Sequence, residues 1–515
     1  MNSLRETAAK RSLPPLPDEH MVASFIHSWS SRDPDLAVML DSGIPAATAL
    51  TRLALVSQQS GRITEAGEFL RFALALAPGD PVLWTNYGVA LSQADSHSNA
   101  AECLEHSLSL MPSQPDTWIA LGVARSELGD FAAAESAYRK ALEQLPDSLV
   151  AWQLLSLLKE QQKDFAGAID CVKACIESGA QDPALFAYLG KLCHQLGRMT
   201  DAYHAYSHAA QMEESNPHYR LMARKSGFLH SLILGDSIES AMIGFDYSFS
   251  PESAELGNEL SNLLNSSFSL LSGFGYLDAA AKVGRKQVEL WPDHPSAYYL
   301  LQAISGDAAL DRSPQEYVVR HFDSFAEGFE SQLVGSLGYD IPRKLCAAIE
   351  GLSEPGKQYD TLDAGCGTGL CGPLLRSRSR CLIGIDISSK MLEQARLKAV
   401  YDELASADLT SYLQRSPARF DLIVAADVMV YFGDLSGLIS MFAGSLRAGG
   451  LLAISTEGWA GPGYKVLPSG RFAHAAGYVR GLAASHFQEL ACIETTIRLE
   501  ANRKLPGNIF IFRKR

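Results

Sequence analysis

Large apolar residues recur every 34 positions along the first half of the chain. One column of such residues comprises Leu50, Trp84, Trp118, Trp152 and Phe186. A second column, of small residues, keeps the same spacing and comprises Ala66, Ala100, Ala134, Ala168 and Ala202. Prolines close three of the units at the same interval, namely Pro78, Pro112 and Pro146. A fixed period of this length predicts a stack of helix pairs, in which each unit buries its apolar face against its neighbours.

This arrangement resembles the tetratricopeptide repeat (TPR). In that repeat a large residue on the first helix, a small residue where the helices cross and a proline at the exit let successive units stack. The resemblance implies an α solenoid of five repeats over residues 47–216. Residues 1–46 are expected to form an N-terminal segment with capping helices, because the end of a solenoid would otherwise expose an apolar face.

The repeat pattern weakens after residue 216 without disappearing. Ala280 and Pro292 lie 12 residues apart, as Ala66 and Pro78 do. Residues 217–305 are therefore predicted to contain degenerate helical repeats, with a capping helix over residues 295–304 at their end.

A TPR solenoid offers a concave groove lined by residues of the first helices. The expected lining is apolar in its middle and comprises Val82, Val89, Ile119, Val123, Val150, Leu154 and Leu157. An apolar groove left open to water promotes aggregation, so an occupant is expected. Two occupants agree with the sequence: a partner protein or peptide, or another part of the same chain.

The second half of the chain carries a different pattern, in which short apolar runs each end at an acidic residue. Four runs end at Asp363, Asp386, Asp408 and Asp427, and a fifth covers residues 451–456. Short apolar runs separated by helix-forming stretches predict the buried strands of a doubly wound α/β sheet. Ligands of such sheets bind outside the carboxyl ends of the strands, where these four acids would lie.

A glycine-rich loop over residues 363–369 joins the first strand to the next helix. Its alternating glycines let the backbone approach a ligand where a Cβ would collide, and the following helix presents free N–H groups. A dinucleotide-binding loop has glycines at its first, third and sixth positions, but the sixth position counted from Gly365 is Leu370. The spacing therefore favours a methyl donor, S-adenosylmethionine, over NAD.

The loop and the strand ends together resemble a class I S-adenosylmethionine-dependent methyltransferase, over about residues 315–515. The resemblance implies a Rossmann-like methyltransferase domain over residues 351–515, with S-adenosylmethionine as cofactor. The implied cofactor-binding residues are Asp363, Gly365, Cys366, Gly367, Gly369, Asp386, Ile387, Asp408, Leu409 and Asp427.

The strand-end acids have distinct expected roles. Asp386 lies 19 residues after Gly367, and its carboxylate can accept hydrogen bonds from both ribose hydroxyls. The resemblance implies that Asp408 accepts a hydrogen bond from the adenine amino group. It also implies that Asp427 lies beside the methionine part or the substrate. The competing interpretation of Asp408 and Asp427 is that they cap helices.

Three residues near the expected substrate side are candidates for catalysis. Arg471 could pair a substrate carboxylate through its planar guanidinium, and His474 could accept a proton from the nucleophile. Tyr431, which follows the fourth strand, is the third candidate. The alternative is that Arg471 caps a helix or pairs Glu457 and that His474 is the polar start of a helix over residues 474–484.

Residues 306–350 are predicted to be a linker with lid helices. Phe322, Phe325 and Phe329 share one helical face by their spacing. They either pack a helix against the core or cover the bound donor and substrate, as helices before the core often do in this family.

Composition narrows the function classes. The formal net charge of −14 argues against nucleic acid or an anionic membrane as a general partner, because phosphate contacts need clustered Lys and Arg. The N-terminus lacks the apolar core of a signal peptide, and no uninterrupted apolar run of about 18 residues occurs, so a cytoplasmic location is expected. Nine scattered cysteines predict reduced thiols. Cys366 and Cys371 have no partners at metal-ligand spacing, so no metal site is expected.

The sequence thus predicts a cytoplasmic enzyme that transfers a methyl group to an O, N or S acceptor, with a solenoid that recruits a protein or peptide. One alternative is a scaffold whose methyltransferase-like domain binds ligand without turnover. Another is a small-molecule methyltransferase whose repeats mediate oligomerisation. No Asn-Pro-Pro-Tyr-like signature or cysteine pair follows the fourth strand, so the sequence does not specify the acceptor.

Overall fold

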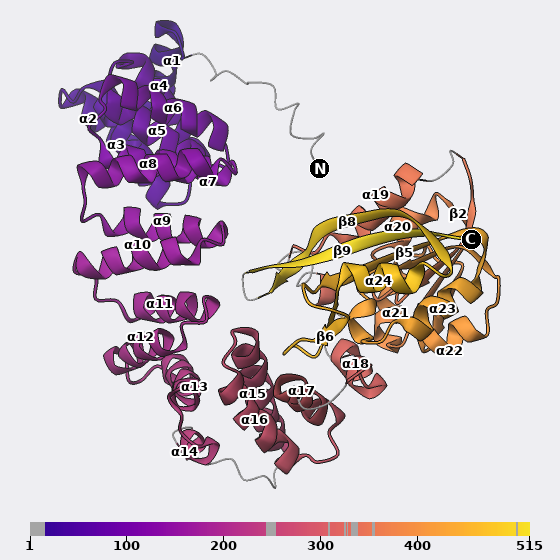
Figure 1. The fold of residues 1–515 in the computed structure, drawn as a ribbon. Helices are drawn as coiled ribbons and strands as arrows, with labels where there is room; N and C mark the ends of the chain where they lie inside the picture. Colours follow the sequence, from indigo (N-terminus) through magenta and orange to yellow (C-terminus); the bar gives the residue numbers. More distant parts are fainter. Residues whose placement is uncertain are drawn as a thin grey trace. The chain divides into compact units, whose positions relative to one another are not determined.

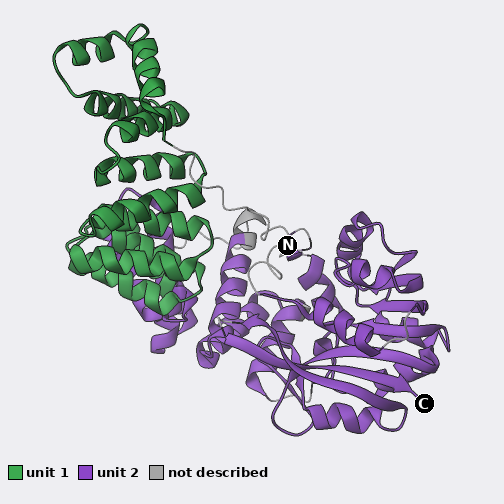
Figure 2. Ribbon diagram, turned by 90° about the horizontal axis from the view of Figure 1, so that it is seen from above, with its two compact units in different colours: residues 1–193 green, residues 194–515 purple. Residues whose placement is uncertain are grey.

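The computed structural model describes residues 16–243, 254–306, 310–323, 326, 328–330, 338–352, 356–500 and 503–515. The chain divides into two compact units, residues 1–193 and 194–515 (Figure 2). The described part of the first unit is helical, whereas the second combines helices with a large sheet (Figure 1). The predicted fold class, a helical solenoid followed by a doubly wound α/β domain, is confirmed. None of the helices described is both long and apolar enough to cross a membrane.

The region predicted to hold five repeats forms consecutive helix pairs. The pairs are α3 (Ala46–Gln59) with α4 (Ile63–Leu76), α5 (Pro81–Gln93) with α6 (His97–Leu110), α7 (Pro115–Glu127) with α8 (Phe131–Gln144), and α9 (Leu149–Gln161) with α10 (Phe165–Glu177). Helices α11 (Pro183–Gln195) and α12 (Met199–Met212) follow in the sequence. Two shorter helices precede the first pair, α1 (Glu19–Ser30) and α2 (Pro34–Asp41). The ring of Phe25 in α1 stacks on Phe72 of α4 with centroids 3.7 Å apart, so α1 covers apolar surface of the first pair.

The residue columns seen in the sequence have distinct packing roles. All five alanines of the small-residue column are fully buried, which lets the paired helices approach closely. The tryptophan and proline columns are linked, because each indole N–H donates to the carbonyl of the proline six residues before it. The donor–acceptor distances are 2.8 Å for Trp84 and Pro78, 3.0 Å for Trp118 and Pro112, and 2.9 Å for Trp152 and Pro146.

Gly122 gives a direct test of this packing. A Cβ at Gly122 would overlap the buried ring of Tyr138, whereas a Cβ at Gly67, on α4, would meet nothing within 4 Å. We expect Gly122→Ala to lower the free energy of unfolding of the solenoid by about 1–3 kcal/mol through overpacking. Gly67→Ala should raise it by roughly 0.5–1 kcal/mol, because alanine favours a helix. Urea unfolding of both variants checks the pair, and equal shifts would contradict the assigned packing.

The expected groove residues differ in exposure. Val82, Val150 and Leu157 are 52%, 55% and 52% exposed. The other expected lining residues, Val89, Ile119, Val123 and Leu154, are half-buried. The first three therefore offer apolar surface to an occupant.

The second unit begins with helices that continue from the repeats. After α12 they are α13 (Pro217–Leu234), α14 (Ile238–Ile243), α15 (Ala254–Gly273), α16 (Leu277–Leu290) and α17 (Pro295–Ser305). Leu264 and Phe268 of α15 pack with Val283 of α16 in one buried cluster. Helix α17 occupies the position predicted for a cap, but it also enters the core of the sheet domain: Tyr299 is buried there and donates to the carbonyl of Gly470 at 2.6 Å. We call α15–α17 the helical block.

Nine strands among the described residues form one sheet. They are β1 (Tyr359–Ala364), β2 (Ser379–Asp386), β3 (Glu403–Ser406), β4 (Phe420–Ala425), β5 (Leu446–Gly458), β6 (Tyr464–Val466), β7 (Phe472–His474), β8 (Phe487–Glu500) and β9 (Arg503–Lys514). The order is β3-β2-β1-β4-β5-β7-β6, with β9 antiparallel to β5 and paired to β8. Strands β1 to β5 are parallel, and the order reverses between β1 and β4. Such a reversal opens a ligand crevice at the carboxyl ends of the strands.

Both faces of the parallel strands β1, β2, β4 and β5 are largely buried, which explains their continuous apolar runs. Leu382 and Leu422 belong to one hydrophobic cluster, and their chain neighbours Ile383 and Ile423 belong to another. The remaining helices of the domain are α18 (Gln315–Asp323), α19 (Ile341–Leu352), α20 (Gly372–Arg376), α21 (Ser389–Leu397), α22 (Leu409–Gln414), the 3₁₀ helix η2 (Met429–Tyr431), α23 (Ser436–Ser445) and α24 (Ala476–Ala483).

Two expectations about local structure are wrong. The run predicted as a strand through Asp408 ends at Ser406, and Asp408 instead caps α22. His474 does not begin a helix: it ends β7, and α24 begins at Ala476. A strand of three residues is too short to show a period of two, so the sequence pattern did not reveal β7.

Candidate functional site

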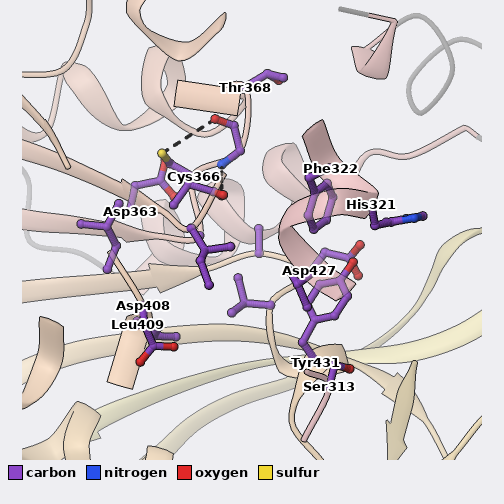
Figure 3. Close-up of a pocket in the computed structure, with 18 of the residues that line it drawn as sticks. Ser313, His321, Phe322, Asp363, Cys366, Thr368, Asp408, Leu409, Asp427 and Tyr431 are labelled. Carbon is purple, nitrogen blue, oxygen red and sulfur yellow. Dashed lines mark hydrogen bonds between the residues drawn. The ribbon is translucent and has the colours of Figure 1, made fainter. Parts of the chain in front are cut away.

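A pocket with a cavity volume of about 180 Å³ lies at the carboxyl ends of β1, β2 and β4 (Figure 3). Its lining includes nine of the ten residues predicted to bind the cofactor: Asp363, Gly365, Cys366, Gly367, Asp386, Ile387, Asp408, Leu409 and Asp427. Gly369 is the exception. A Cβ there would meet the ring of Tyr401 at 3.0 Å, so this glycine permits close packing beneath the loop and does not line the pocket.

The glycine loop needs its glycines for two reasons. Gly365 and Gly367 have φ angles of 71° and 54°, in the left-handed region that side chains disfavour. A Cβ at Gly365 would lie 2.5 Å from Val428 Cγ2, whereas a Cβ at Gly367 would meet nothing within 4 Å. Gly365 therefore allows the β1 and β4 loops to meet, and Gly367 leaves open space beside the pocket. Cys366 between them is buried, and burial raises the pKa of its thiol well above the usual value.

Asp386 is fixed by backbone donors. Its two carboxylate oxygens accept from the N–H of Gly367 and from the N–H of Ser388, each at 2.9 Å. Burial raises the pKa of Asp386, and these hydrogen bonds act in the opposite direction. A carboxylate has about four lone-pair sites, so acceptor capacity is left for a hydroxyl group of a ligand.

Asp363 lies at the end of β1 and is almost completely buried. Its Oδ2 accepts from the hydroxyl of Tyr401 at 2.7 Å. Burial raises the pKa of Asp363 to about 7, although the hydrogen bond from Tyr401 opposes the shift. The folded chain therefore keeps this proton to a much higher pH than the unfolded chain, in which an aspartate releases it near pH 4, its usual pKa being about 3.9.

The difference between the pKa of Asp363 in the folded chain and in the unfolded chain makes the free energy of unfolding depend on pH. The contribution of Asp363 is fully present below pH 4 and is lost as the pH rises to about 7, by up to about 1.4 kcal/mol per pH unit. We expect Asp363→Asn to remove this component, so the variant should lose less stability than the unchanged chain between pH 5 and pH 8. Unfolding free energies at the two pH values test it, and parallel pH profiles would contradict the shift.

Asp408 caps a helix, as the competing interpretation predicted, and it also lines the pocket. Its Oδ1 accepts from the N–H of Ser411 at 3.1 Å, which caps α22. Its other oxygen pairs with Arg312. Burial raises the pKa of Asp408, but hydrogen bonds from Thr410, Ser411 and Arg312 outweigh burial and lower it.

Arg471 joins several parts of the site. Its guanidinium donates to Asp427 Oδ1 at 2.7 Å, to Glu457 Oε1 at 2.6 Å and to the Tyr431 hydroxyl at 3.1 Å. Arg498 donates to the same oxygen of Glu457 at 2.6 Å. The predicted alternative, that Arg471 pairs Glu457, is therefore observed, and the same side chain also lines the pocket.

This network fixes the charge states near the pocket. Burial raises the pKa of Asp427, but the charges of Arg471 and Arg498 outweigh burial and lower it. Asp427 has a φ of 59°, a strained backbone conformation for a residue other than glycine. Burial also raises the pKa of Tyr431 well above its usual value, so its phenol stays protonated and can donate a hydrogen bond.

His474 is not brought into the pocket with the other candidates. The ring is completely buried, and its Nε2 donates to the carbonyls of Phe432 and Gly433 at 2.8 and 3.2 Å. Burial lowers its pKa to about 4. These contacts make His474 a support for the chain after η2.

Several pocket residues were not predicted individually. Arg312, Val318 and His321 come from or adjoin α18, which lies before the sheet domain in the sequence. Phe322 and Phe329 line the pocket as well, and the ring of Phe322 lies 5.7 Å from that of Tyr431. In Figure 3 the rings of Phe322 and Tyr431 lie across the pocket from Asp363 and Cys366. The aromatic spacing indicated a lid, but Phe325 lies outside the described residues.

Comparison with protein families agrees with this geometry. The family model described as "Methyltransferase domain" matches residues 362–454, and the model described as "Tetratricopeptide repeat" matches residues 115–158. The matched methyltransferase segment contains the glycine loop and all four strand-end acids.

Among curated proteins, the malonyl-[acyl-carrier protein] O-methyltransferase of Acetivibrio thermocellus is 34% identical over 103 residues, which are 20% of this chain and 36% of that protein. The aklanonic acid methyltransferase DauC of Streptomyces sp. strain C5 is 26% identical over 31% of this chain and 73% of its own. A solved structure, magnesium protoporphyrin IX methyltransferase from Synechocystis PCC 6803 with bound SAM, is 19% identical with a TM-score of 0.31, over 41% of this chain and all of that one.

The sheet domain is thus a methyltransferase domain. More specifically, the chain joins a segment that matches a methyltransferase domain to N-terminal residues that match a tetratricopeptide repeat, and S-adenosylmethionine is the methyl donor expected from the glycine loop. The pocket suits that group: Gly367 leaves space for close approach, and Asp386 retains acceptor capacity for a ribose hydroxyl. Ile387 and Leu409 supply apolar walls.

Proposed function

We propose that this protein transfers the methyl group of S-adenosylmethionine to an O, N or S acceptor, and that its repeats recruit a protein or peptide that is or delivers the acceptor. The observation that carries the proposal is the single pocket that collects the glycine loop and the four strand-end acids. Four acidic side chains that are distant in sequence converge there.

The residues of the chain act mainly by positioning. The bound cofactor supplies a methyl group already activated by its sulfonium. Asp386 holds the ribose side, Phe322 and Val318 exclude water, and Arg471 keeps the Tyr431 hydroxyl in place beside the reacting groups. Alignment of reacting groups alone can lower a barrier by several kcal/mol, roughly 7–11 in favourable cases.

Oxygen is the favoured acceptor atom. Two relatives carry names that point that way: one is a malonyl-[acyl-carrier protein] O-methyltransferase and another, from Thiobacillus denitrificans, a ubiquinone biosynthesis O-methyltransferase. His474 is buried and hydrogen-bonded to backbone carbonyls outside the pocket, so it is not placed to take a proton from an acceptor. This position favours an acceptor that reacts without a histidine base.

Substitutions of exposed residues in the expected groove test whether the repeats recruit a protein or peptide. We expect the double variant Val150→Asp, Leu157→Asp to lose methyl labelling of the protein fraction of a lysate, because charges on these exposed positions oppose an apolar contact. Leu110→Asp, on the second helix of its pair and 43% exposed, is the control and should label as the unchanged chain does. Tritiated S-adenosylmethionine provides the readout. Equal labelling by both variants would contradict recruitment through the groove.

A further inference from the structure

A second cavity adjoins the cofactor pocket, and the proposed function assigns it no role. One wall comes from the helical block, with Phe268, Phe274 and Leu300, and the other from Tyr317 of α18 and the loop at Pro468 and Ser469. Both walls belong to the second unit of the chain.

The two cavities meet at four shared side chains. His321, Phe329, Tyr431 and Arg471 line both. A molecule lying in the second cavity therefore reaches the cofactor pocket at the Tyr431 hydroxyl and the Arg471 guanidinium. Both groups can donate hydrogen bonds. The phenol of Tyr431 stays protonated. The guanidinium of Arg471 has five N–H groups, and each of its three nitrogens already donates to one partner, namely Asp427, Glu457 or Tyr431.

The second cavity combines apolar walls with positive charge. Two of its arginines are balanced, since Arg498 pairs Glu457 and Glu500, and Arg471 pairs Asp427 and Glu457. Arg320 lies in the same lining, and no ion pair forms between it and any described residue. Burial, with a smaller contribution from the charge of Arg320, lowers the pKa of His294 on the opposite wall, which favours the neutral form of that histidine.

We propose that this cavity is the acceptor channel and that it takes a carboxylate carried on an apolar body. The apolar body lies between the helical block and the loop at Pro468, and the carboxylate reaches Tyr431 and Arg471. The positive charge of Arg320 in this lining attracts the anion. This assignment rests on the proposed function and adds the substrate class to it.

The chemistry balances without a base. A carboxylate oxygen forms a bond to the methyl carbon as the bond from that carbon to the sulfonium sulfur breaks. The electron pair of the broken bond stays on sulfur, the negative and positive charges cancel, and no proton moves. The products are a methyl ester and S-adenosylhomocysteine. A site of this kind needs donors facing the carboxylate and no proton acceptor, as Tyr431 and Arg471 provide.

The test is calorimetry on the full chain saturated with S-adenosylhomocysteine. The probes are two matched pairs, 4-phenylbutyrate with 4-phenylbutyramide, and N-acetyl-Phe-Leu as the free acid with its C-terminal amide. We expect an acid to bind at least tenfold more tightly than its amide. Tighter binding of 4-phenylbutyrate than of its amide would indicate that the acceptor is a small molecule. Tighter binding of the N-acetyl-Phe-Leu acid than of its amide would indicate that the acceptor is the carboxyl terminus of a peptide.

Two variants connect binding to the cavity. Ser269→Trp places a large ring at an exposed lining position and should reduce acid binding more than twentyfold, while Arg320→Gln should reduce it three- to tenfold. Asn262→Trp, exposed on the same helix but outside the lining, is the control and should bind as the unchanged chain does. Equal affinity for acids and amides, or unchanged acid affinity in Ser269→Trp, would overturn the proposal.

The affinity for S-adenosylhomocysteine distinguishes a failure of this proposal from a failure of the proposed function. All three variants should bind S-adenosylhomocysteine with unchanged affinity, because none of the altered residues lines the cofactor pocket. A chain that binds the acids but not S-adenosylhomocysteine would contradict the proposed function and leave the cavity assignment standing.

Discussion

Asp386→Asn is expected to weaken S-adenosylmethionine binding by about 100-fold or more. Hydrogen bonds to a charged group contribute about 1.5–3 kcal/mol each, and we propose that this carboxylate accepts from the ribose hydroxyls. The substitution also replaces one acceptor oxygen with an amide that cannot accept from the N–H of Gly367 or of Ser388, so the loop loses support as well. Calorimetric titration of the purified full chain measures the change.

The matched control for this substitution is Asp360→Asn. Asp360 lies near the start of β1, away from the carboxyl ends of the strands, and pairs with Arg380 and Arg447. Its loss should leave cofactor affinity within about twofold, since its partners are on the surface. If both variants bind S-adenosylmethionine as tightly as the unchanged chain, Asp386 does not hold the ribose.

Arg471→Met is expected to lower the free energy of unfolding by about 3–5 kcal/mol, because it leaves the carboxylates of Asp427 and Glu457 buried with fewer partners. Glu457 is completely buried, and one of its oxygens already has no hydrogen-bond partner among the described residues. Methyl transfer should fall as well, because the Tyr431 hydroxyl loses the donor that positions it. Urea unfolding of the full chain, analysed as separate solenoid and sheet transitions, measures the stability change.

Arg480→Met provides the comparison for an exposed arginine. Arg480 pairs with Glu489 at 2.9 Å, and both side chains are open to solvent. An exposed pair of this kind contributes about 0–1 kcal/mol, so the sheet transition should hardly move. Similar effects of the two substitutions would show that the network around Arg471 does not carry the stability assigned to it.

The features read correctly from the sequence depend on short-range patterns. The repeat columns reflect packing between neighbouring helices, and the strand-end acids follow apolar runs that belong to a sheet buried on both faces. Ser388 has a residue type that favours helix N-caps, and its hydroxyl accepts from the N–H of Met391 at 3.1 Å at the start of α21. In each case the residues that decide the outcome lie within one element or one repeat.

The features that were missed depend on contacts between distant residues. Tyr299 reaches Gly470 across 171 positions, Arg312 pairs Asp408 across 96, and Arg471 meets Asp427 across 44. No local period encodes such contacts. The placement of His474 was missed for a related reason, since its carbonyl partners at Phe432 and Gly433 become neighbours only when the short strand β7 joins the sheet beside η2.

The most direct measurement of the central claim uses tritiated S-adenosylmethionine, the purified full chain and a lysate of the source organism from which the gene has been deleted. The unchanged chain should transfer label to an acceptor, and Asp386→Asn should not. Separating protein from small molecules then shows which fraction carries the methyl group, and alkali should release it if the product is an ester. Tight binding of S-adenosylmethionine by calorimetry, with no label in any fraction, would contradict the claim and would identify the domain as a ligand-binding scaffold.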